Sequence, residues 1–276
     1  MDELSAAQAL ADQCVEALND LRSRAAFFDR LIQRLLPLDH KRIFWGNRTL
    51  ALGKNAGFLD DPRFAAAFQR IHSSQKYDQY DAPQSVAWRL HTLVWAAQSA
   101  LALPGDFVEC GVFRGNYSWV VAELTDFATQ PKTFYLYDTF AGFASAYSSP
   151  ADFPDNPQFF DAAQKEYEDP ANYAEVARKF NGYSNVRIVR GVLPDILSEG
   201  APDKIAFLHI DLNSPAAEIG TLEILFDRVV PGGVIVFDDY GVFLFRKQKE
   251  AEDTFMAARG YTILELSTGQ GLVVKR

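Results

Sequence analysis

Apolar residues recur at two different spacings along this chain, and the spacing changes near residue 103. Over residues 6–36 they recur at steps of three and four, which is typical of amphipathic helices, and Pro37 ends the pattern. Two further helical stretches run over about residues 62–71 and 83–102. We therefore expect residues 1–103 to form an all-helical N-terminal region, which can serve as a cap, as part of an acceptor pocket or as a homo-oligomer interface.

Beyond residue 103 the chain alternates short runs of β-forming residues with helical stretches. The strand-like runs cover residues 107–110, 133–137, 186–189, 205–210 and 234–237. This alternation is typical of a parallel sheet with helices on both faces. Two last runs, 261–266 and 272–276, flank the turn 267–271 and predict an antiparallel hairpin. We expect residues 104–276 to form a doubly wound α/β domain whose mostly parallel, seven-stranded sheet ends in this hairpin.

Composition narrows the class of protein. The 276 residues are 48% hydrophobic, which is ample for a globular core. The apolar runs are shorter than a membrane-spanning helix and the N-terminus does not resemble a secretion signal, so we expect a cytoplasmic protein without a membrane partner. The net charge of −9 disfavours nucleic acid and favours a small-molecule partner. Cys14 and Cys110 lack the spacing of zinc ligands or of a disulfide framework.

A glycine-containing turn follows the first predicted strand. Its pattern is E-x-G-x-x-x-G, formed by Glu109, Gly111 and Gly115, and a dinucleotide fingerprint would instead require G-x-G-x-x-G. S-adenosylmethionine (SAM) carries no phosphate and can accept such a looser turn, with the Glu109 carboxylate meeting the ammonium of its methionine moiety. Cys110 and Ser118 belong to the same candidate cofactor site. The alternative is an ordinary tight turn between a strand and a helix.

Two more candidate cofactor contacts follow the next strands. Asp138, with Thr139 beside it, comes after residues 133–137, where an acidic side chain can accept both ribose hydroxyls of a nucleoside. Gly191 and Val192 follow residues 186–189, where the adenine would lie. Three such features in order at successive strand ends favour a nucleoside-containing cofactor over chance.

Three aspartates follow the next two strands. Asp211 ends residues 205–210, and Asp238 and Asp239 end residues 234–237. Adjacent parallel strands bring these carboxylates to one edge of the sheet, where mutual repulsion favours a hard divalent cation such as Mg²⁺. The alternative is that the aspartates only cap the following helices.

His209 lies two residues before Asp211, on the same side of its strand. It is a candidate general base or a positioner of the metal carboxylates, and Asp211 is the other candidate catalytic residue. More often a histidine at this position is a hydrogen-bonded core residue.

Residues 140–180 form a long, aromatic-rich and proline-punctuated connection. At the carboxyl edge of the sheet it is either a lid over the acceptor or an additional packed helix with aromatic side chains in the core.

Four segments together resemble the macrocin O-methyltransferase (mycinamicin/tylosin) family of class I SAM-dependent methyltransferases. The matching segments are GDFVECGV at 105–112, DTFAGF at 138–143, VRIVRG at 186–191 and PGGVIVFDDYG at 231–241. The family methylates deoxysugar hydroxyls with SAM and Mg²⁺. The resemblance implies that Glu109, Gly111 and Asp138 bind SAM, and that Asp211, Asp238 and Asp239 hold the metal, as in the similar catechol O-methyltransferases.

One loop departs from the family pattern. Where the family tends to have Asp-Gly-Asp-Leu-Tyr-Glu, this chain has Asp-Leu-Asn-Ser-Pro-Ala at 211–216. A catechol-type enzyme would place a lysine at Ser214. The first aspartate of the motif, Asp211, is present, so the loop can still contribute to a metal site. For activation of the hydroxyl we consider Asp211 together with the metal first, and His209 second.

These features favour a SAM-dependent O-methyltransferase acting on a hydroxyl of a sugar-bearing or polyol small molecule. A SAM- or nucleoside-binding protein without methyl transfer is the second interpretation, because of the altered loop at 211–216. A nicotinamide-dependent oxidoreductase is the third, and the incomplete glycine fingerprint and the final hairpin disfavour it.

Overall fold

A computed structural model describes residue 12 and residues 43–46, 49–52, 54–72 and 86–276. By packing, the chain separates into two compact units, residues 1–88 and 89–276. Apart from Asp12, the helical stretch predicted over 6–36 lies outside the described residues. The unit boundary falls near the start of α4 (Ala87–Ala100), so most of this helix belongs to the second unit, although its sequence had placed it in the N-terminal region.

The first unit combines helices with a short hairpin. The 3₁₀ helix η1 (Gly57–Asp60) leads into α3 (Pro62–His72), whose N-terminus is capped by Asp61. The strands β1 (Ile43–Gly46) and β2 (Thr49–Leu52) pair antiparallel. The predicted helices are therefore confirmed within the described part, and the expectation of an all-helical region is corrected. The sequence analysis missed these two strands because four residues are too few to show the alternation of apolar and polar side chains that is typical of a strand. The Gly46-Asn47 pair between them is a turn signal.

The second unit is built on a seven-stranded sheet with the order β5-β4-β3-β6-β7-β9-β8. Its parallel strands are β3 (Asp106–Cys110), β4 (Phe134–Asp138), β5 (Val186–Arg190), β6 (Ile205–Ile210) and β7 (Val229–Phe237). β9 (Gly271–Val274) is antiparallel to β7 and to the edge strand β8 (Leu264–Glu265). The doubly wound sheet with a final antiparallel hairpin is confirmed.

Two of the predicted strands begin three or more residues away from their observed starts. The strand predicted over 261–266 is only two residues long, whereas β7 begins at Val229, before the predicted start at Val234. The early part of β7 follows from pairing with the chain end, because Gly232 N donates to Lys275 O and Lys275 N donates to Gly233 O.

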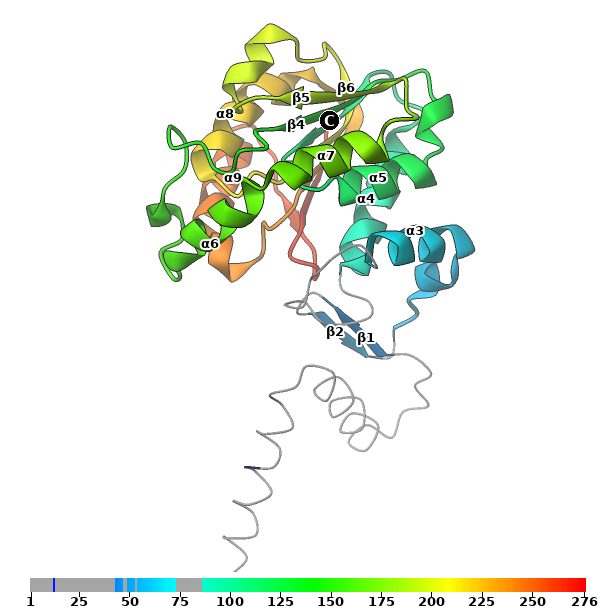
Figure 1. Ribbon diagram of the computed structural model, residues 1–276, viewed down its shortest axis with the longest axis horizontal. Coiled ribbons are helices and arrows are strands. Elements are labelled where there is room, and N and C mark those ends of the chain that lie inside the picture. The colour runs from blue at the N-terminus through cyan, green and yellow to red at the C-terminus, as the bar shows by residue number, and fades with distance from the viewer. Residues whose placement is uncertain (1–11, 13–42, 47–48, 53, 73–85) are drawn as a thin grey trace, which may run out of the picture. The chain divides into compact units, whose positions relative to one another are not determined.

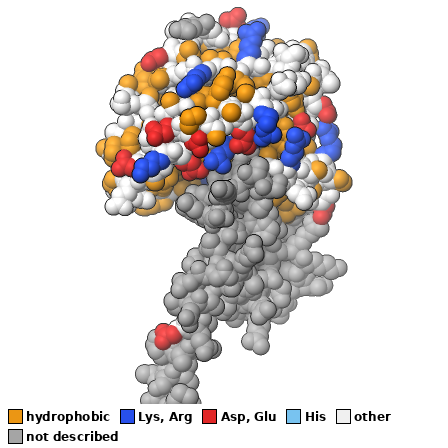
Figure 2. Space-filling model, viewed as in Figure 1, with side chains coloured by type: hydrophobic (Ala, Val, Ile, Leu, Met, Phe, Trp, Pro, Cys, Tyr) orange, Lys and Arg blue, Asp and Glu red, His pale blue; other side chains and the backbone are white. Residues whose placement is uncertain are grey.

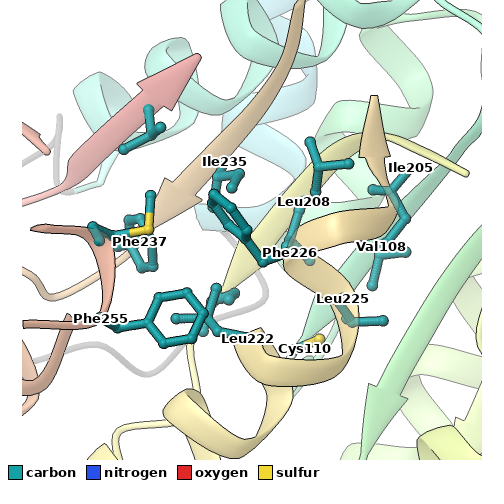
Figure 3. Close-up of a cluster of buried hydrophobic side chains, with 14 of the residues drawn as sticks. Val108, Cys110, Ile205, Leu208, Leu222, Leu225, Phe226, Ile235, Phe237 and Phe255 are labelled. Carbon is teal, nitrogen blue, oxygen red and sulfur yellow. The ribbon is translucent and has the colours of Figure 1, made fainter. Parts of the chain in front are cut away.

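Helices cover both faces of the sheet (Figure 1). They are α4, α5 (Asn116–Leu124), α6 (Gln158–Tyr167), α7 (Pro170–Lys179), α8 (Pro215–Leu225) and α9 (Arg246–Ala257). The side chains of α8 and α9 pack onto alternate residues of β3, β6 and β7, such as Val108, Leu208 and Ile235 (Figure 3). Because strand side chains alternate, Glu109 and His209 project to the opposite face, which leaves that face to carry the polar groups described below.

The connection over 140–180 forms packed helices, as the second of its two interpretations proposed. α6 and α7 follow one another, and an aromatic cluster fills the space beside them. Its rings, 5.0–6.3 Å apart between centroids, are Phe143, Phe153, Phe159, Phe160, Tyr167 and Phe245. This segment is therefore part of the core packing at the carboxyl edge of the sheet.

Charged side chains of both signs are interspersed on the visible face of the second unit (Figure 2). No helix in the described part of the chain is long and apolar enough to cross a bilayer.

A buried pair of acidic side chains joins α8 to α9. Glu218 and Glu252 are fully buried and lie within hydrogen-bonding reach of each other. Burial raises the pKa of Glu252 to about 8, and burial together with Glu252 raises the pKa of Glu218 well above its usual range. Two ionised carboxylates this close would repel, so the pair holds a proton in the native protein at neutral pH.

The Glu252→Gln substitution should make the protein less sensitive to rising pH. Native Glu252 keeps its proton up to about pH 8, whereas the unfolded chain releases it near pH 4.3, so the free energy of unfolding falls by about 1.4 kcal/mol for each pH unit between these values. Glutamine carries no such proton. The melting temperature of the variant minus that of the wild type should therefore increase from pH 6 to pH 8. A constant difference, or the same trend in the exposed control Glu250→Gln, would contradict the shared proton.

Gly111 directly follows β3 and lies close to the backbone that follows β6. Its φ angle is +88°, and a Cβ atom at this position would lie 1.8 Å from the carbonyl oxygen of Asp211. Because the obstacle is backbone, no side-chain movement can relieve it. Only glycine fits here.

Gly111→Ala should destabilise the protein by about 3 kcal/mol or more, since backbone overlap and a left-handed φ act together. The matched control is Gly182→Ala, where a Cβ atom would meet nothing within 4 Å. Thermal unfolding measured by circular dichroism should show a lower melting temperature for the first variant alone. Equal melting temperatures would show that the two strands can separate at this point without cost.

Candidate functional site

Five strand ends meet at one edge of the sheet. β5, β4, β3, β6 and β7 are parallel neighbours, so the turns that follow them lie side by side. The glycine turn follows β3, Asp138 ends β4, Asp211 follows β6 and Asp238 follows β7. The structure therefore brings the predicted cofactor residues and the predicted metal ligands to a single edge.

The glycine turn at 111–115 is held by backbone hydrogen bonds. Gly111 N donates to Tyr137 O at 2.9 Å, and Gly115 N donates to Val112 O at 2.7 Å. Gly115 has a φ angle of +66° and starts α5, while Phe113 also has a positive φ. The turn thus adopts a conformation that requires its glycines and presents the N-terminal end of α5 to the sheet edge.

Asp138 orders this turn. Its Oδ2 accepts from Val112 N at 2.7 Å and from Phe113 N at 2.8 Å, and its Oδ1 accepts from Phe140 N at 2.6 Å. A carboxylate oxygen has two acceptor positions, so Oδ1 has room for a hydroxyl as well. Asp138 can therefore position the turn and contact a ribose at the same time.

The other candidate cofactor residues occupy this edge in different ways. The Thr139 hydroxyl donates to Gly142 O at 2.7 Å within its own turn, and Gly191 N donates to Asp138 O at 3.0 Å, which ties the turn after β5 to β4. Val192 is half-buried next to Gly191. The Cys110 side chain is fully buried in the core on the other face of the sheet, so only its backbone faces the candidate site.

Two buried polar atoms near the glycine turn lack a hydrogen-bond partner among the described residues. Glu109 Oε2 and Ser118 Oγ have no hydrogen bond to any described residue, and both side chains are buried. Buried polar atoms are normally paired, so each calls for a ligand or water. A carboxylate oxygen suits an ammonium group, and the residues present therefore fit the methionine end of SAM.

The three aspartates form one acidic cluster. One oxygen from each of Asp211, Asp238 and Asp239 lies within 4.8 Å of the others. Carboxylate oxygens are the preferred ligands of Mg²⁺, and this donor set fits a hard divalent cation. Burial, and then the like charges of Asp238 and Asp239, raise the pKa of Asp211 well above its usual range.

A chain of alternating charges links this cluster to β3. His209 Nδ1 lies 2.9 Å from Glu109 Oε1, and His209 Nε2 lies 3.8 Å from Asp238 Oδ1. The strand register places Glu109 opposite His209, and Asp238 lies on the same face one strand further on. The pairing therefore follows directly from strand alternation.

His209 is a positioning group in this arrangement. Burial opposes its charged form, but the contacts with Asp238 and Glu109 outweigh burial and raise the pKa of His209 to about 10. His209 is only 1% exposed and its two ring nitrogens face Glu109 and Asp238, so its side chain is out of reach of a substrate proton. Of the two candidate catalytic residues, only Asp211 is partly exposed at the sheet edge.

The sequence analysis missed two residues that hold Asp238. Arg89 on α4 contacts Asp238 Oδ2 at 2.5 Å and Asp239 Oδ1 at 2.8 Å, and Gln270 Nε2 donates to Asp238 Oδ1 at 2.9 Å. Burial disfavours the charged form of Asp238, but Arg89 and then His209 and Gln270 lower its pKa to about 2. The only sequence signals were an arginine within an apolar helix and a glutamine within the final turn.

The altered loop at 211–216 is held by a third missed residue. Glu218 Oε1 accepts from Leu212 N and from Asn213 N, both at 3.1 Å. Ser214 caps α8 by accepting from Ala217 N at 3.3 Å. Glu218 thus anchors this loop through backbone groups, at a position outside the family motif.

Comparison with known proteins agrees with this geometry. The family model Macrocin-O-methyltransferase (TylF) matches residues 85–264. The mycinamicin III 3''-O-methyltransferase of Micromonospora griseorubida is 29% identical over 164 residues, which cover 55% of this chain and 62% of that protein. The 8-demethyl-8-(2,3-dimethoxy-alpha-L-rhamnosyl)-tetracenomycin-C 4'-O-methyltransferase of Streptomyces olivaceus is 26% identical over 165 residues, which cover 56% and 60%. Both alignments span less than two thirds of the relative.

Among solved structures, the O-methyltransferase NovP superposes with a TM-score of 0.62 at 18% identity, covering 80% of this chain and 99% of that one. This likeness establishes the fold. The segment matched by the family model is more than half of the chain and contains the glycine turn, Asp138 and all three aspartates. The chain therefore belongs to the macrocin O-methyltransferase family.

Proposed function

We propose that this protein is a SAM-dependent O-methyltransferase that methylates a hydroxyl of a sugar-bearing small molecule, with a divalent cation such as Mg²⁺ at the acidic cluster. The observation that carries the proposal is the shared edge of the sheet. There the glycine turn and Asp138 lie next to Asp211, Asp238 and Asp239. A methyl donor and an activated hydroxyl must meet in line, and adjacent strand ends provide this proximity.

The names of the relatives support the acceptor class. One relative is a 3''-O-methyltransferase for mycinamicin III, and the other is a 4'-O-methyltransferase for a rhamnosyl-bearing tetracenomycin. Both transfer the methyl group to oxygen, and the second names a sugar. For this chain we accordingly propose a glycosylated small molecule as acceptor.

The chain's own residues divide the work between donor and acceptor. The glycine turn, Glu109 and Asp138 would hold the donor through its ammonium and ribose groups. Asp211, Asp238 and Asp239 would hold the cation, which when bound acidifies a coordinated hydroxyl and fixes its oxygen. Asp211 is our candidate for taking the hydroxyl proton, because it is partly exposed at the edge whereas His209 is sealed between Glu109 and Asp238.

Isothermal titration with S-adenosylhomocysteine, with NAD⁺ as a control, tests the donor site first. We expect micromolar binding of S-adenosylhomocysteine and none of NAD⁺. Methyl transfer from labelled SAM to a panel of glycosides then separates an enzyme from a SAM-binding protein without activity. Binding of NAD⁺ alone would contradict the proposal.

Asp138→Ala should weaken S-adenosylhomocysteine binding by about 1–3 kcal/mol, because ribose hydroxyls lose their acceptor; this is roughly 5- to 150-fold in Kd. The variant also frees two backbone N–H groups of the glycine turn. Its melting temperature is therefore measured in parallel. An unchanged Kd in a folded variant would refute the ribose role of Asp138.

Asp211→Asn should remove the response to divalent cations while sparing the donor site. We expect Mn²⁺ binding to weaken by at least about tenfold, as for other lost metal contacts, with the S-adenosylhomocysteine Kd within about threefold of wild type. Wild-type methyl transfer should fall in EDTA and return with Mg²⁺. Equal wild-type activity in EDTA and in Mg²⁺ would contradict the proposed divalent cation at the acidic cluster.

A further inference from the structure

The acidic cluster contains a positive charge of its own. Arg89 reaches it from α4 with a side chain that is only 6% exposed. Its Nη1 contacts Asp238 Oδ2 at 2.5 Å and its Nη2 contacts Asp239 Oδ1 at 2.8 Å. One guanidinium group therefore bridges two consecutive carboxylates, which is the planar, two-pronged contact that arginine makes and lysine cannot.

The surrounding donors hold Asp238 in a single orientation. Arg89 takes Oδ2, and Gln270 donates to Oδ1 at 2.9 Å. The turn that carries Gln270 is tied down in its own right, because Gly241 N donates to Gly269 O at 2.7 Å. Rotation of the Asp238 side chain would break both contacts at a buried position, which is costly.

The charges in this part of the site can be counted. When ionised, the three aspartates carry three negative charges, and Arg89 returns one positive charge. Arg89 contacts two of these three aspartates directly. Among these described side chains two negative charges remain, which a divalent cation balances and a trivalent cation exceeds. Without Arg89 three negative charges would remain.

We infer that Arg89 is a fixed counter-cation of the metal site, which sets its charge to favour divalent over trivalent cations and holds Asp238 and Asp239 in position. Arg89 acts through the two aspartates and is a positioning residue. The inference rests on the proposed cation site. If Arg89 had only a structural role, its removal would weaken the binding of divalent and trivalent cations alike. If Arg89 acts through its charge, its removal changes the ratio of the divalent to the trivalent Kd, because a trivalent cation responds more strongly to each unit charge.

The test compares Mn²⁺ and Tb³⁺ binding by isothermal titration of the full chain with saturating S-adenosylhomocysteine. In Arg89→Gln the ratio of the Mn²⁺ Kd to the Tb³⁺ Kd should increase by about tenfold or more. The matched control Arg89→Lys keeps the charge and should keep the ratio within about threefold of wild type, even if both cations bind more weakly.

A second pair of variants keeps the test decisive if Arg89→Gln does not fold. Asp239→Asn with Arg89 intact lowers the negative charge and should decrease the ratio. The double variant Arg89→Gln/Asp239→Asn restores two negative charges and should return the ratio to the wild-type value. Folding is checked by thermal unfolding and by S-adenosylhomocysteine binding.

The outcomes separate this inference from the proposed function. A ratio that stays constant across the folded variants, or that changes equally in Arg89→Lys and Arg89→Gln, overturns the role of Arg89 and leaves the cation site intact. Wild-type protein that binds neither cation overturns both the role of Arg89 and the cation site. The S-adenosylhomocysteine titration of the same samples reports on the donor site independently.

Discussion

The compensation of buried charge is the constraint on which this site depends. Glu109, His209, Asp238, Arg89 and Asp239 alternate in sign along a continuous chain of contacts. They come from β3, β6, the end of β7 and α4, so the same contacts join three strands and a helix. Removal of one partner would leave its neighbour charged and buried, which costs more than the pair itself contributes.

This chain of charges also relates the two halves of the site. Glu109 is the residue that we propose for the donor side, and its second oxygen is buried without a hydrogen bond to any described residue. Asp238 belongs to the acidic cluster. His209 lies between them. His209 and the backbone contact of Gly111 with Asp211 together fix the spacing between the glycine turn and the acidic cluster. Methyl transfer demands a fixed spacing of this kind, since small errors in the position of donor and acceptor are expensive.

The loop at 211–216 departs from the family pattern and is held through its backbone by a residue outside that pattern. The chain lacks the tyrosine and glutamate expected there, and Asn213 has a positive φ angle. Glu218, one turn into α8, accepts from two of the loop's amide groups. Its partner Glu252 on α9 ties this anchor to the core, so the position of Asp211 depends on packing well behind the sheet edge.

The sequence by itself determined the second unit and most of its site, because both rest on local patterns. Strand periodicity, the glycine turn and the aspartates at strand ends are each encoded within a few residues, and parallel pairing then brings the ends together. Only the tertiary structure revealed Arg89, Gln270 and Glu218, since their roles come from contacts with residues distant in sequence or outside any motif. It also decided that His209 is buried between Glu109 and Asp238, that Cys110 faces the core and that β1 and β2 pair antiparallel. A side chain's charge state and its partners depend on burial and neighbours, which no local pattern contains.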